Sequence, residues 1–386
     1  MNFKTIASIL VKLILSLLVF VLLFASIFYI NTTIYNFPEP KAFSGDTIFN
    51  PYENLPDSSY RANFHAHTVA WKSVTNGHNT EKDVFDGYTE RGYDIAGISN
   101  YHKISTYGKQ FTDLYIPVYE HGYNIFKSHY LAINSPKVSY FDYPLYQLTS
   151  HKQKIIENIK ANGAMVSMAH PKFAGGRSFS DMQHLVGYEF TEVLNHYRVS
   201  EEHWDAALSA GRLTWIMGND DTHDLVKEPT FRIWNIIHSE VRHPDSVMQA
   251  MKHGKNYAIW SHNGECDNLL ESCEVKDATL SICLSTKADS IVLKGQDGKV
   301  VAKILNDDNI NYIFSENDTY VRAVAYNKNS HLYLNPILRI DGENAPLNVN
   351  VKAEANFMKT WGFRIVAFLV SLSLLFLMRR IWRRKK

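Results

Sequence analysis

Two long apolar segments, one near each end of the sequence, constrain the fold of this chain more than any other feature. Residues 13–30 are apolar except for Ser16 and Ser26, and at 1.5 Å per residue they cover roughly 27 Å, enough to cross a hydrocarbon core. Residues 361–378 are also mainly apolar, and their single charged residue, Arg364, lies near the start, where its side chain can reach the interface. The two segments predict transmembrane helices over 13–30 and 361–378.

A cleavable signal peptide is the alternative interpretation of the first segment. Residues 24–27 read Phe-Ala-Ser-Ile and lack the small-x-small pattern that precedes a cleavage site. This absence favours an uncleaved anchor.

Basic residues at both ends set the expected orientation. Lys4 and Lys12 lie in residues 1–12, and six of the eight residues of the tail 379–386 are basic. The positive-inside rule places both tails in the cytoplasm. We therefore expect a protein of the cytoplasmic (inner) membrane, held in the lipid bilayer by two helices, with residues 31–360 facing the periplasm or the cell exterior.

Overall composition narrows the class of protein. The 386 residues leave room for two domains, and 40 basic against 39 acidic residues give a net charge of +1. This balance gives no sign of nucleic-acid binding. Three cysteines (Cys266, Cys273 and Cys283) are too few for a disulfide framework and lack zinc-motif spacing. One disulfide and three buried thiols both stay open.

Between the anchors, the hydrophobic pattern changes twice. Residues 31–60 lack periodicity and predict a tether. Residues 61–264 alternate short apolar runs with helical patterns, which predicts a parallel sheet, open or closed into a barrel. The expected helices are 147–162, 201–210 and 244–253, with another capped by Thr80, and the expected strands are 94–98, 115–119, 165–169, 188–194 and 213–217.

Residues 265–345 have the period-two pattern of an antiparallel β domain, which we expect to be sandwich-like. Residues 290–293 and 299–304 flank Gly295-Gln296-Asp297-Gly298, which predicts a hairpin. Residues 346–360 would then link this domain to the second membrane helix.

Histidines are concentrated in the region of alternating strands and helices. Of the 17 in the chain, all but His331 lie between His65 and His262. His65 and His67 are separated by one residue, so an extended backbone points both imidazoles to the same side. Such a pair suits a divalent metal such as zinc.

Potential metal ligands follow nearly every expected strand of this region. Because the carboxyl ends of barrel strands meet at one rim, we expect these side chains to converge into a polynuclear metal site. The alternative for any one of them is an ordinary loop residue or a hydrogen-bonded histidine. The series comprises His65, His67, His102, Glu120, His129, His170, Glu192, Asp221 and His223.

Several of these residues stand in motifs that resemble a known family. His65-Ala66-His67-Thr68, Glu120, His129, Ala169-His170-Pro171 and Asp221-Thr222-His223 are similar, in order and spacing, to the motifs of the PHP (polymerase and histidinol phosphatase) family. Residues 333–337 also resemble a strand of the β domain that often follows it. The resemblance implies a distorted (β/α)7 TIM-like barrel followed by a small antiparallel β-sandwich domain, with two or three divalent metal ions (Zn, Mn or Fe).

The resemblance also implies a set of ligands. One metal would be bound by His65, His67, Glu120 and Asp221. A second would be bound by Glu120, His129 and His170, with Glu120 bridging, and His223 would serve a third.

Two segments depart from the family pattern. Ser99-Asn100-Tyr101-His102 stands where relatives usually have Thr-Asp-His, so either His102 takes that role one residue late or the ligand is missing. Thr75-Asn76-Gly77 replaces the usual Ser-Asp-Gly.

The expected function is metal-dependent hydrolysis of a phosphate ester outside the cytoplasm, on a phosphorylated substrate whose identity stays open. His223 or His102 would supply a proton to the leaving group. Lys172, Arg177 and Arg198 could clamp phosphate, with solvated surface charge as the alternative. Two other hypotheses remain: a catalytically degenerate envelope module that binds metal or another ligand, and metal-dependent hydrolysis of another bond, such as an amide.

Overall fold

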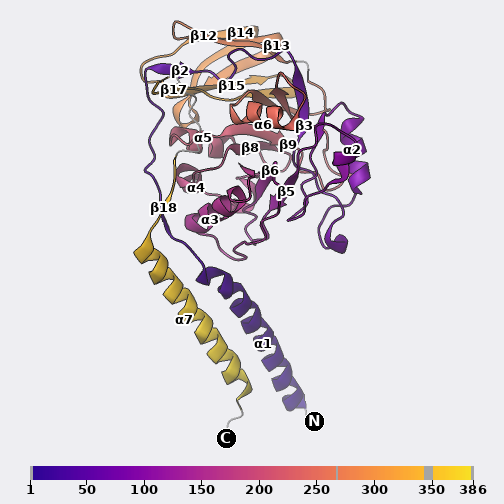
Figure 1. Cartoon of the computed structure of the whole chain (residues 1–386), viewed down its shortest axis with the longest axis vertical. Coiled ribbons are helices and arrows are strands. Elements are labelled where there is room, and N and C mark those ends of the chain that lie inside the picture. The colour runs from indigo at the N-terminus through magenta and orange to yellow at the C-terminus, as the bar shows by residue number, and fades with distance from the viewer. Residues whose placement is uncertain (1–2, 267, 343–350, 384–386) are drawn as a thin grey trace.

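The computed structural model describes residues 3–266, 268–342 and 351–383. Parts of the expected β domain, linker (346–360) and basic tail (379–386) fall on residues 343–350 and 384–386, which lie outside the described residues. The described chain consists of a mixed α/β body from which two long helices, α1 and α7, extend in the same direction (Figure 1).

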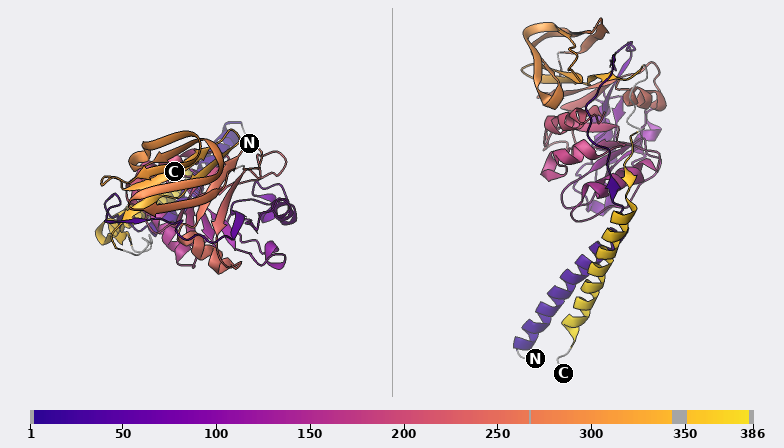
Figure 2. Two further views of the ribbon diagram at one scale, coloured as in Figure 1. Left: turned by 90° about the horizontal axis from the view of Figure 1, so that it is seen from above. Right: turned by 90° about the vertical axis from the view of Figure 1, so that its left-hand side faces the viewer.

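Both expected membrane segments form helices long enough to cross a bilayer. α1 (Phe3–Ile30) and α7 (Phe357–Trp382) leave only 11% and 6% of their most apolar stretches buried, which distinguishes them from core helices. They run antiparallel and side by side in two perpendicular views (Figures 1 and 2). Ser26 and Ser371 share a hydrogen bond of 2.8 Å between them. The start of α1 and the end of α7 therefore lie together, at the end of the helix pair that is far from the body.

The segment predicted as a tether is bound to the body rather than free. β1 (Tyr35–Asn36) pairs with β18 (Glu354–Ala355), which joins the two chain segments next to the helices. β2 (Thr47–Phe49) adds to the edge of β17 (Ile337–Ile340). These pairings limit how far the body can move from α1 and α7.

Four helices of the body form where the sequence periodicity predicts them, and one was not predicted. Thr80 caps α2 (Glu81–Thr89) by accepting a hydrogen bond from Asp83 N, and the helix buries Val84, Phe85 and Tyr88. The other predicted helices are α3 (Thr149–Lys160), α5 (Glu201–Ser209) and α6 (Pro244–Lys252), whereas α4 (Phe179–His184) was not predicted. The short 3-10 turns are η1 (Trp71–Ser73), η2 (Tyr107–Gln110), η3 (Phe173–Gly175) and η4 (Gln296–Gly298).

Among the described residues, a five-stranded sheet forms one half of the body. Its order is β5-β6-β7-β8-β9, and only the β7-β8-β9 part is parallel. The strands are β5 (Val118–His121), β6 (Tyr130–Ile133), β7 (Met165–Met168), β8 (Phe190–Asn195) and β9 (Trp215–Asn219).

A second, eleven-stranded sheet of the described residues contains all the remaining strands except the pair β1 and β18. It runs β12-β13-β15-β16-β11-β10-β3-β4, with β14, β17 and β2 attached at the side. Its remaining members are β3 (Ser59–Asn63), β4 (Ile95–Ala96), β10 (Ile233–His238), β11 (Asn256–Ser261), β12 (Leu270–Lys276), β13 (Thr279–Lys294), β14 (Val300–Ile313), β15 (Tyr320–Tyr326) and β16 (Ser330–Leu334).

The expected closed TIM-like barrel is not formed by the described residues. In the described part of the chain, the β pairing between the two sheets is limited to isolated bridges, Ala66–Thr222 and Tyr101–Glu120. The barrel stays open because β4 is too short: only two of its residues pair with β3. The chain that follows β4 contacts β5 through individual hydrogen bonds, such as that from Glu120 N to Ser99 O at 3.1 Å, and not through a continuous ladder. The structure is therefore a mixed α/β fold with two sheets that approach each other at two places, beyond the ends of β3 and β9 and between the segment after β4 and β5.

The region expected to be a separate β sandwich continues one of these sheets. β16 pairs directly with β11, so the ladder runs unbroken from the α/β region into residues 270–340. The hairpin around residues 295–298 is confirmed as β13, η4 and β14. Arg322 of β15 is fully buried and donates to Asp205 (2.7 Å) and Glu201 (2.9 Å) of α5, which ties the regions together.

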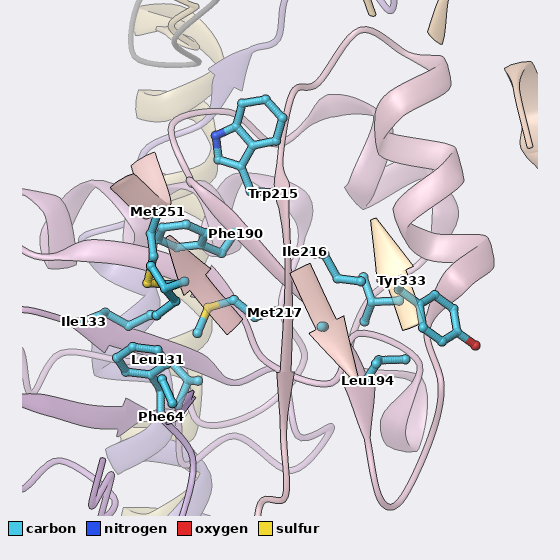
Figure 3. Packing of buried hydrophobic residues seen from close by; sticks show 14 of the residues in the cluster. Phe64, Leu131, Ile133, Phe190, Leu194, Trp215, Ile216, Met217, Met251 and Tyr333 are labelled. Carbon is cyan, nitrogen blue, oxygen red and sulfur yellow. The ribbon is translucent and has the colours of Figure 1, made fainter. Parts of the chain in front are cut away.

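The main core lies between the sheets, beneath the ends of the strands that carry the candidate ligands. Phe64, Leu131, Phe190 and Met217 come from four separate segments and are fully buried in one cluster (Figure 3). Close packing of this kind transmits any shift of one strand to its neighbours. It holds the strand ends above it in fixed positions.

Candidate metal centre

The structure brings six of the predicted metal ligands together at the strand ends. His65 and His67 follow β3, Glu120 lies in β5, and His129 immediately precedes β6, which is antiparallel to β5. His170 follows β7 and Asp221 follows β9. All six side chains are buried.

Four ligand atoms of this group face one another without hydrogen-bond partners. His65 Nε2 lies 3.0 Å from Asp221 Oδ1 and 3.5 Å from Glu120 Oε2. His67 Nε2 lies 3.1 Å from Glu120 Oε2 and 3.3 Å from Asp221 Oδ1. All four atoms are buried and unpaired. Ligands about 2.0–2.1 Å from a tetrahedral zinc ion lie roughly 3.3 Å apart, so the spacing fits a metal ion at their centre.

A second group shares Glu120 with the first. Glu120 Oε1 lies 2.6 Å from His129 Nδ1 and 3.2 Å from His170 Nε2. Each carboxylate oxygen of Glu120 thus faces a different set of imidazoles. This is the arrangement required of a carboxylate that bridges two ions.

Two of the candidate ligands have unusual backbone conformations. His170 has φ of 28° and Asp221 has φ of 53°, which for residues other than glycine costs of order 1–3 kcal/mol. Backbone hydrogen bonds hold both positions: Glu192 Oε2 accepts from His170 N (2.9 Å), and His65 O accepts from Asp221 N (2.9 Å). The strain is maintained where it directs a side chain into the group.

Glu192 belongs to the predicted series but not to the ligand set that the resemblance implies, and in the structure it orients the group. Its Oε1 accepts a hydrogen bond of 2.9 Å from His65 Nδ1 and another of 2.9 Å from Asn219 Nδ2. The bond fixes the His65 tautomer so that Nε2 presents its lone pair to the group. The position of Glu192 in a predicted strand made it a candidate in the sequence, but no sequence pattern indicated its hydrogen bond to His65.

Adjacent aspartates in the Asn219-Asp220-Asp221 segment have separate tasks. Asp220 accepts hydrogen bonds from Phe231 N (2.8 Å), Ile233 N (3.0 Å) and Tyr88 Oη (2.8 Å), so it fixes the loop before β10. Burial raises the pKa of Asp220 to about 6, even though these hydrogen bonds oppose the shift. Asp221 alone faces the ligand group.

Electrostatics keep the two carboxylates of the group ionised. Burial raises the pKa of Glu120, but His129 and His65 outweigh it and hold that pKa well below its usual value. Burial likewise raises the pKa of Asp221, but His65 and the nearby His67 outweigh it and lower that pKa. In return, Asp221, Glu192 and Glu120 overcome the effect of burial on His65 and raise its pKa well above the usual range. A metal ion would replace these imidazole protons.

The segment that departs from the PHP pattern also reaches the group. Both polar atoms of the Asn100 side chain are hydrogen-bonded to Thr68. Asn100 Oδ1 accepts from Thr68 N (2.8 Å), and Asn100 Nδ2 donates to Thr68 Oγ1 (2.7 Å). Tyr101 stacks on His67, with 4.7 Å between the ring centroids. Burial, followed by the charge of Glu120, raises the pKa of the Tyr101 phenol well above its usual value. A phenol therefore lies beside Glu120.

His223 and His102, the expected proton donors, have different surroundings. His223 stacks on His67 at 4.2 Å, and its Nδ1 donates to Asp221 O at 3.0 Å, while Nε2 is buried and unpaired. His102 uses both ring nitrogens on the backbone: Nδ1 donates to Ser139 O (3.0 Å) and Nε2 accepts from Gly122 N (3.0 Å). His102 has no nitrogen free for a metal or a leaving group.

The expected phosphate clamps occupy three different environments. Arg177 is buried and donates to His129 O at 2.8 Å, so it braces the backbone of a candidate ligand. Lys172 is exposed and lies 3.5 Å from Glu202. Arg198 is also exposed, and its Nη1 donates to Tyr197 O. The structure uses all three on protein partners.

Comparisons with known proteins give limited information. No protein-family model matches the chain, and no curated protein matches its sequence. Among solved structures, the chain is similar to a two-domain protein from Bacteroides vulgatus ATCC 8482 that contains a predicted PHP-like metal-dependent phosphoesterase. The identity is 11%, the likeness covers 83% of this chain and 99% of that one, and the TM-score is 0.43. A likeness at this level does not establish a function.

The hydrogen bond from His65 to Glu192 provides a test of the site that leaves every candidate ligand in place. We expect Glu192→Gln to lower the affinity for Zn²⁺ or Mn²⁺ by about 10–100-fold, because His65 would lose the carboxylate that orients it. Competition with a fluorescent chelator measures this affinity. The matched control is Glu189→Gln, since Glu189 binds Val166 N and Lys160 instead. Equal affinities for Glu192→Gln and the unsubstituted chain would contradict the assigned role.

Proposed function

We propose that this chain is a membrane-anchored, metal-dependent phosphoesterase of the PHP type. The observation that carries the proposal is the set of four buried, unpaired ligand atoms of His65, His67, Glu120 and Asp221, which lie 3.0–3.5 Å apart where measured. A mixed nitrogen and oxygen set of this kind suits Zn, Mn or Fe. The ordered motifs of the sequence support the PHP assignment.

The two groups of ligands around Glu120 suit a site with two ions. Two bound divalent ions would activate a water molecule and stabilise the charge that develops on the phosphate oxygens. The protein itself needs no side-chain nucleophile for such a reaction. Its contribution is to hold Glu120 between the groups and to keep the ligands buried and oriented.

His223 is proposed to act as a ligand or a proton acceptor rather than as the proton donor. The carbonyl of Asp221 can only accept a hydrogen bond, so Nδ1 carries the proton and neutral Nε2 presents a lone pair. Burial, followed by the charge on His67, lowers the pKa of His223 to about 4, which keeps the ring neutral near pH 7. An unpaired Nε2 next to His67 suits the third metal position.

Activity of the purified full-length chain in detergent, with added Mn²⁺ or Zn²⁺, tests the function. We expect hydrolysis of p-nitrophenyl phosphate, and His67→Ala and His170→Ala are expected to reduce it by more than the 10–100-fold that the loss of an outer partner costs. His262→Ala serves as the control because this exposed histidine packs on Trp260. Near-stoichiometric bound metal without turnover would instead favour a degenerate binding module.

The proposed orientation has a separate test. A reporter enzyme that works only outside the cytoplasm, fused near Asn350, is expected to be active, because both basic tails are proposed to stay in the cytoplasm. A matched fusion that follows Lys386 should be inactive. Activity of only the Lys386 fusion would contradict the orientation.

A further inference from the structure

The loops next to the membrane helices expose an unusual number of large apolar and aromatic side chains. We define the aromatic surface as Tyr123, Ile125, Phe126, Tyr140 and Tyr146, whose exposed fractions are 45%, 64%, 41%, 62% and 63%. They come from two loop segments, residues 121–128 and 134–148. Neighbouring exposed side chains of this kind commonly mark an interaction site. The two loops contact each other: Phe126 and Tyr146 pack edge to face with 5.7 Å between the ring centroids, and Ile125 N donates to Pro144 O at 3.2 Å.

Direct contacts place the aromatic surface at the body end of α1. Tyr29, in the last turn of α1, accepts a hydrogen bond from Leu145 N (3.1 Å) and donates one to Tyr146 O (3.0 Å). Phe28 packs against Phe141 with 6.1 Å between the rings. If α1 spans a bilayer, its last turn lies near the headgroup layer, and the residues bound to it must lie there too.

An apolar groove continues from these loops into the space between the helices. It has a volume of about 380 Å³ and is lined by Leu22 and Tyr29 of α1, Val366 and Val370 of α7, and Leu145 of the second loop. Within a bilayer, this groove would be open to acyl chains. The contact of Leu145 with it makes the loop continuous with the lipid-facing surface.

The charges of the two loops match an anionic lipid layer. Lys127 and Lys137 are exposed. The single acidic residue of the two loops, Asp142, is buried and accepts hydrogen bonds from Tyr123 N (2.8 Å), Tyr143 N (2.7 Å) and Gln147 Nε2 (2.7 Å). Aromatic rings and lysines with no exposed carboxylate are the composition that the headgroup layer favours.

The first of these loops also connects two of the proposed metal ligands. Residues 121–128 begin directly after Glu120 and end directly before His129. Glu120 Oε1 and His129 Nδ1 lie 2.6 Å apart, so the loop leaves the metal centre, reaches the aromatic surface and returns. The centre is therefore one short loop away from the body end of α1.

We propose that the aromatic surface rests in the headgroup layer of the membrane that α1 and α7 span, and that the metal centre acts on phosphate esters carried by lipids. The substrate part of this inference rests on the proposed function, whereas the position of the surface does not. A second protein or a second copy of the chain are the other candidate occupants. The bilayer is favoured because Tyr29 ties Leu145 and Tyr146 to the last turn of a membrane helix.

The position of the surface is tested with the full-length chain in phosphatidylcholine nanodiscs. Ile125→Trp adds a fluorophore to the aromatic surface. Ile313→Trp adds one to a similarly exposed isoleucine (71%), the last residue of β14, and β14 lies at the end of the body that is far from α1 and α7 (Figure 1). After subtraction of the native tryptophan emission, lipids brominated near the headgroup are expected to quench at least half of the Ile125→Trp signal and almost none of the Ile313→Trp signal. Equal quenching of the two would overturn the proposal, whether another protein or nothing covers the surface.

The substrate class is tested by comparing two phosphate esters in the same nanodiscs. Phosphatidic acid is the lipid probe and p-nitrophenyl phosphate the soluble one. We expect Ile125→Asp to lower the ratio of lipid to soluble hydrolysis at least tenfold, mainly through the KM for the lipid, while Ile313→Asp leaves the ratio unchanged.

Each outcome of this comparison has a distinct meaning. Soluble hydrolysis without release of phosphate from phosphatidic acid, or an unchanged ratio in Ile125→Asp, overturns the lipid substrate. Hydrolysis of neither ester by the metal-loaded chain refutes the proposed function and with it the lipid substrate, and the quenching result then decides the position of the surface by itself.

Discussion

The arrangement of the strand ends depends on two buried, ionised carboxylates, Glu120 and Asp221, which lie next to the same pair of histidines. Removing such charges from water costs several kcal/mol each unless positive or polar partners compensate. Without a metal ion, protonated His65 and His67 supply that compensation, as the shifts in their pKa values indicate. Yet the two Nε2 atoms and the carboxylate oxygens that face them lack hydrogen-bond partners. The imidazoles therefore balance the negative charge but do not form hydrogen bonds with these oxygens. A divalent ion would do both.

The surrounding layer of the fold holds these groups in place. Asn219 joins β3 to β8, since it accepts from Phe64 N (2.8 Å) and donates to Glu192 (2.9 Å). Asn63 joins β3 to the end of β9 by accepting from Asp220 N (2.9 Å). Because the described backbone pairs between the two sheets only at isolated bridges near the site, these side chains take the place of the ladder that a closed barrel would have had.

The sequence predicted that these side chains come together, because the information it needed for that is local. Each strand end could be located from an apolar run, and the residue that follows it could be read directly, as for His67 and Asp221. Pairing partners are not local. The antiparallel β5-β6-β7 arrangement and the β11-β16 pairing depend on which strand edges meet, which periodicity does not encode. Periodicity therefore could not show that the described strands leave the barrel open, or that the β region continues the sheet of the α/β region. His102 and Arg177 show the same limit for side chains, because hydrogen bonds to the distant carbonyls of Ser139 and His129 decide their environments.

The central claim is that a metal ion belongs between His65, His67, Glu120 and Asp221. Anomalous X-ray scattering from crystals of the protein, collected at the absorption edge of the metal found in the purified chain, tests it most directly. The account predicts one peak about 2.0–2.2 Å from the four facing atoms and a second peak on the other side of Glu120, next to His129 and His170. A chain purified and reconstituted with Zn²⁺ or Mn²⁺ that shows no peak at these residues would contradict it.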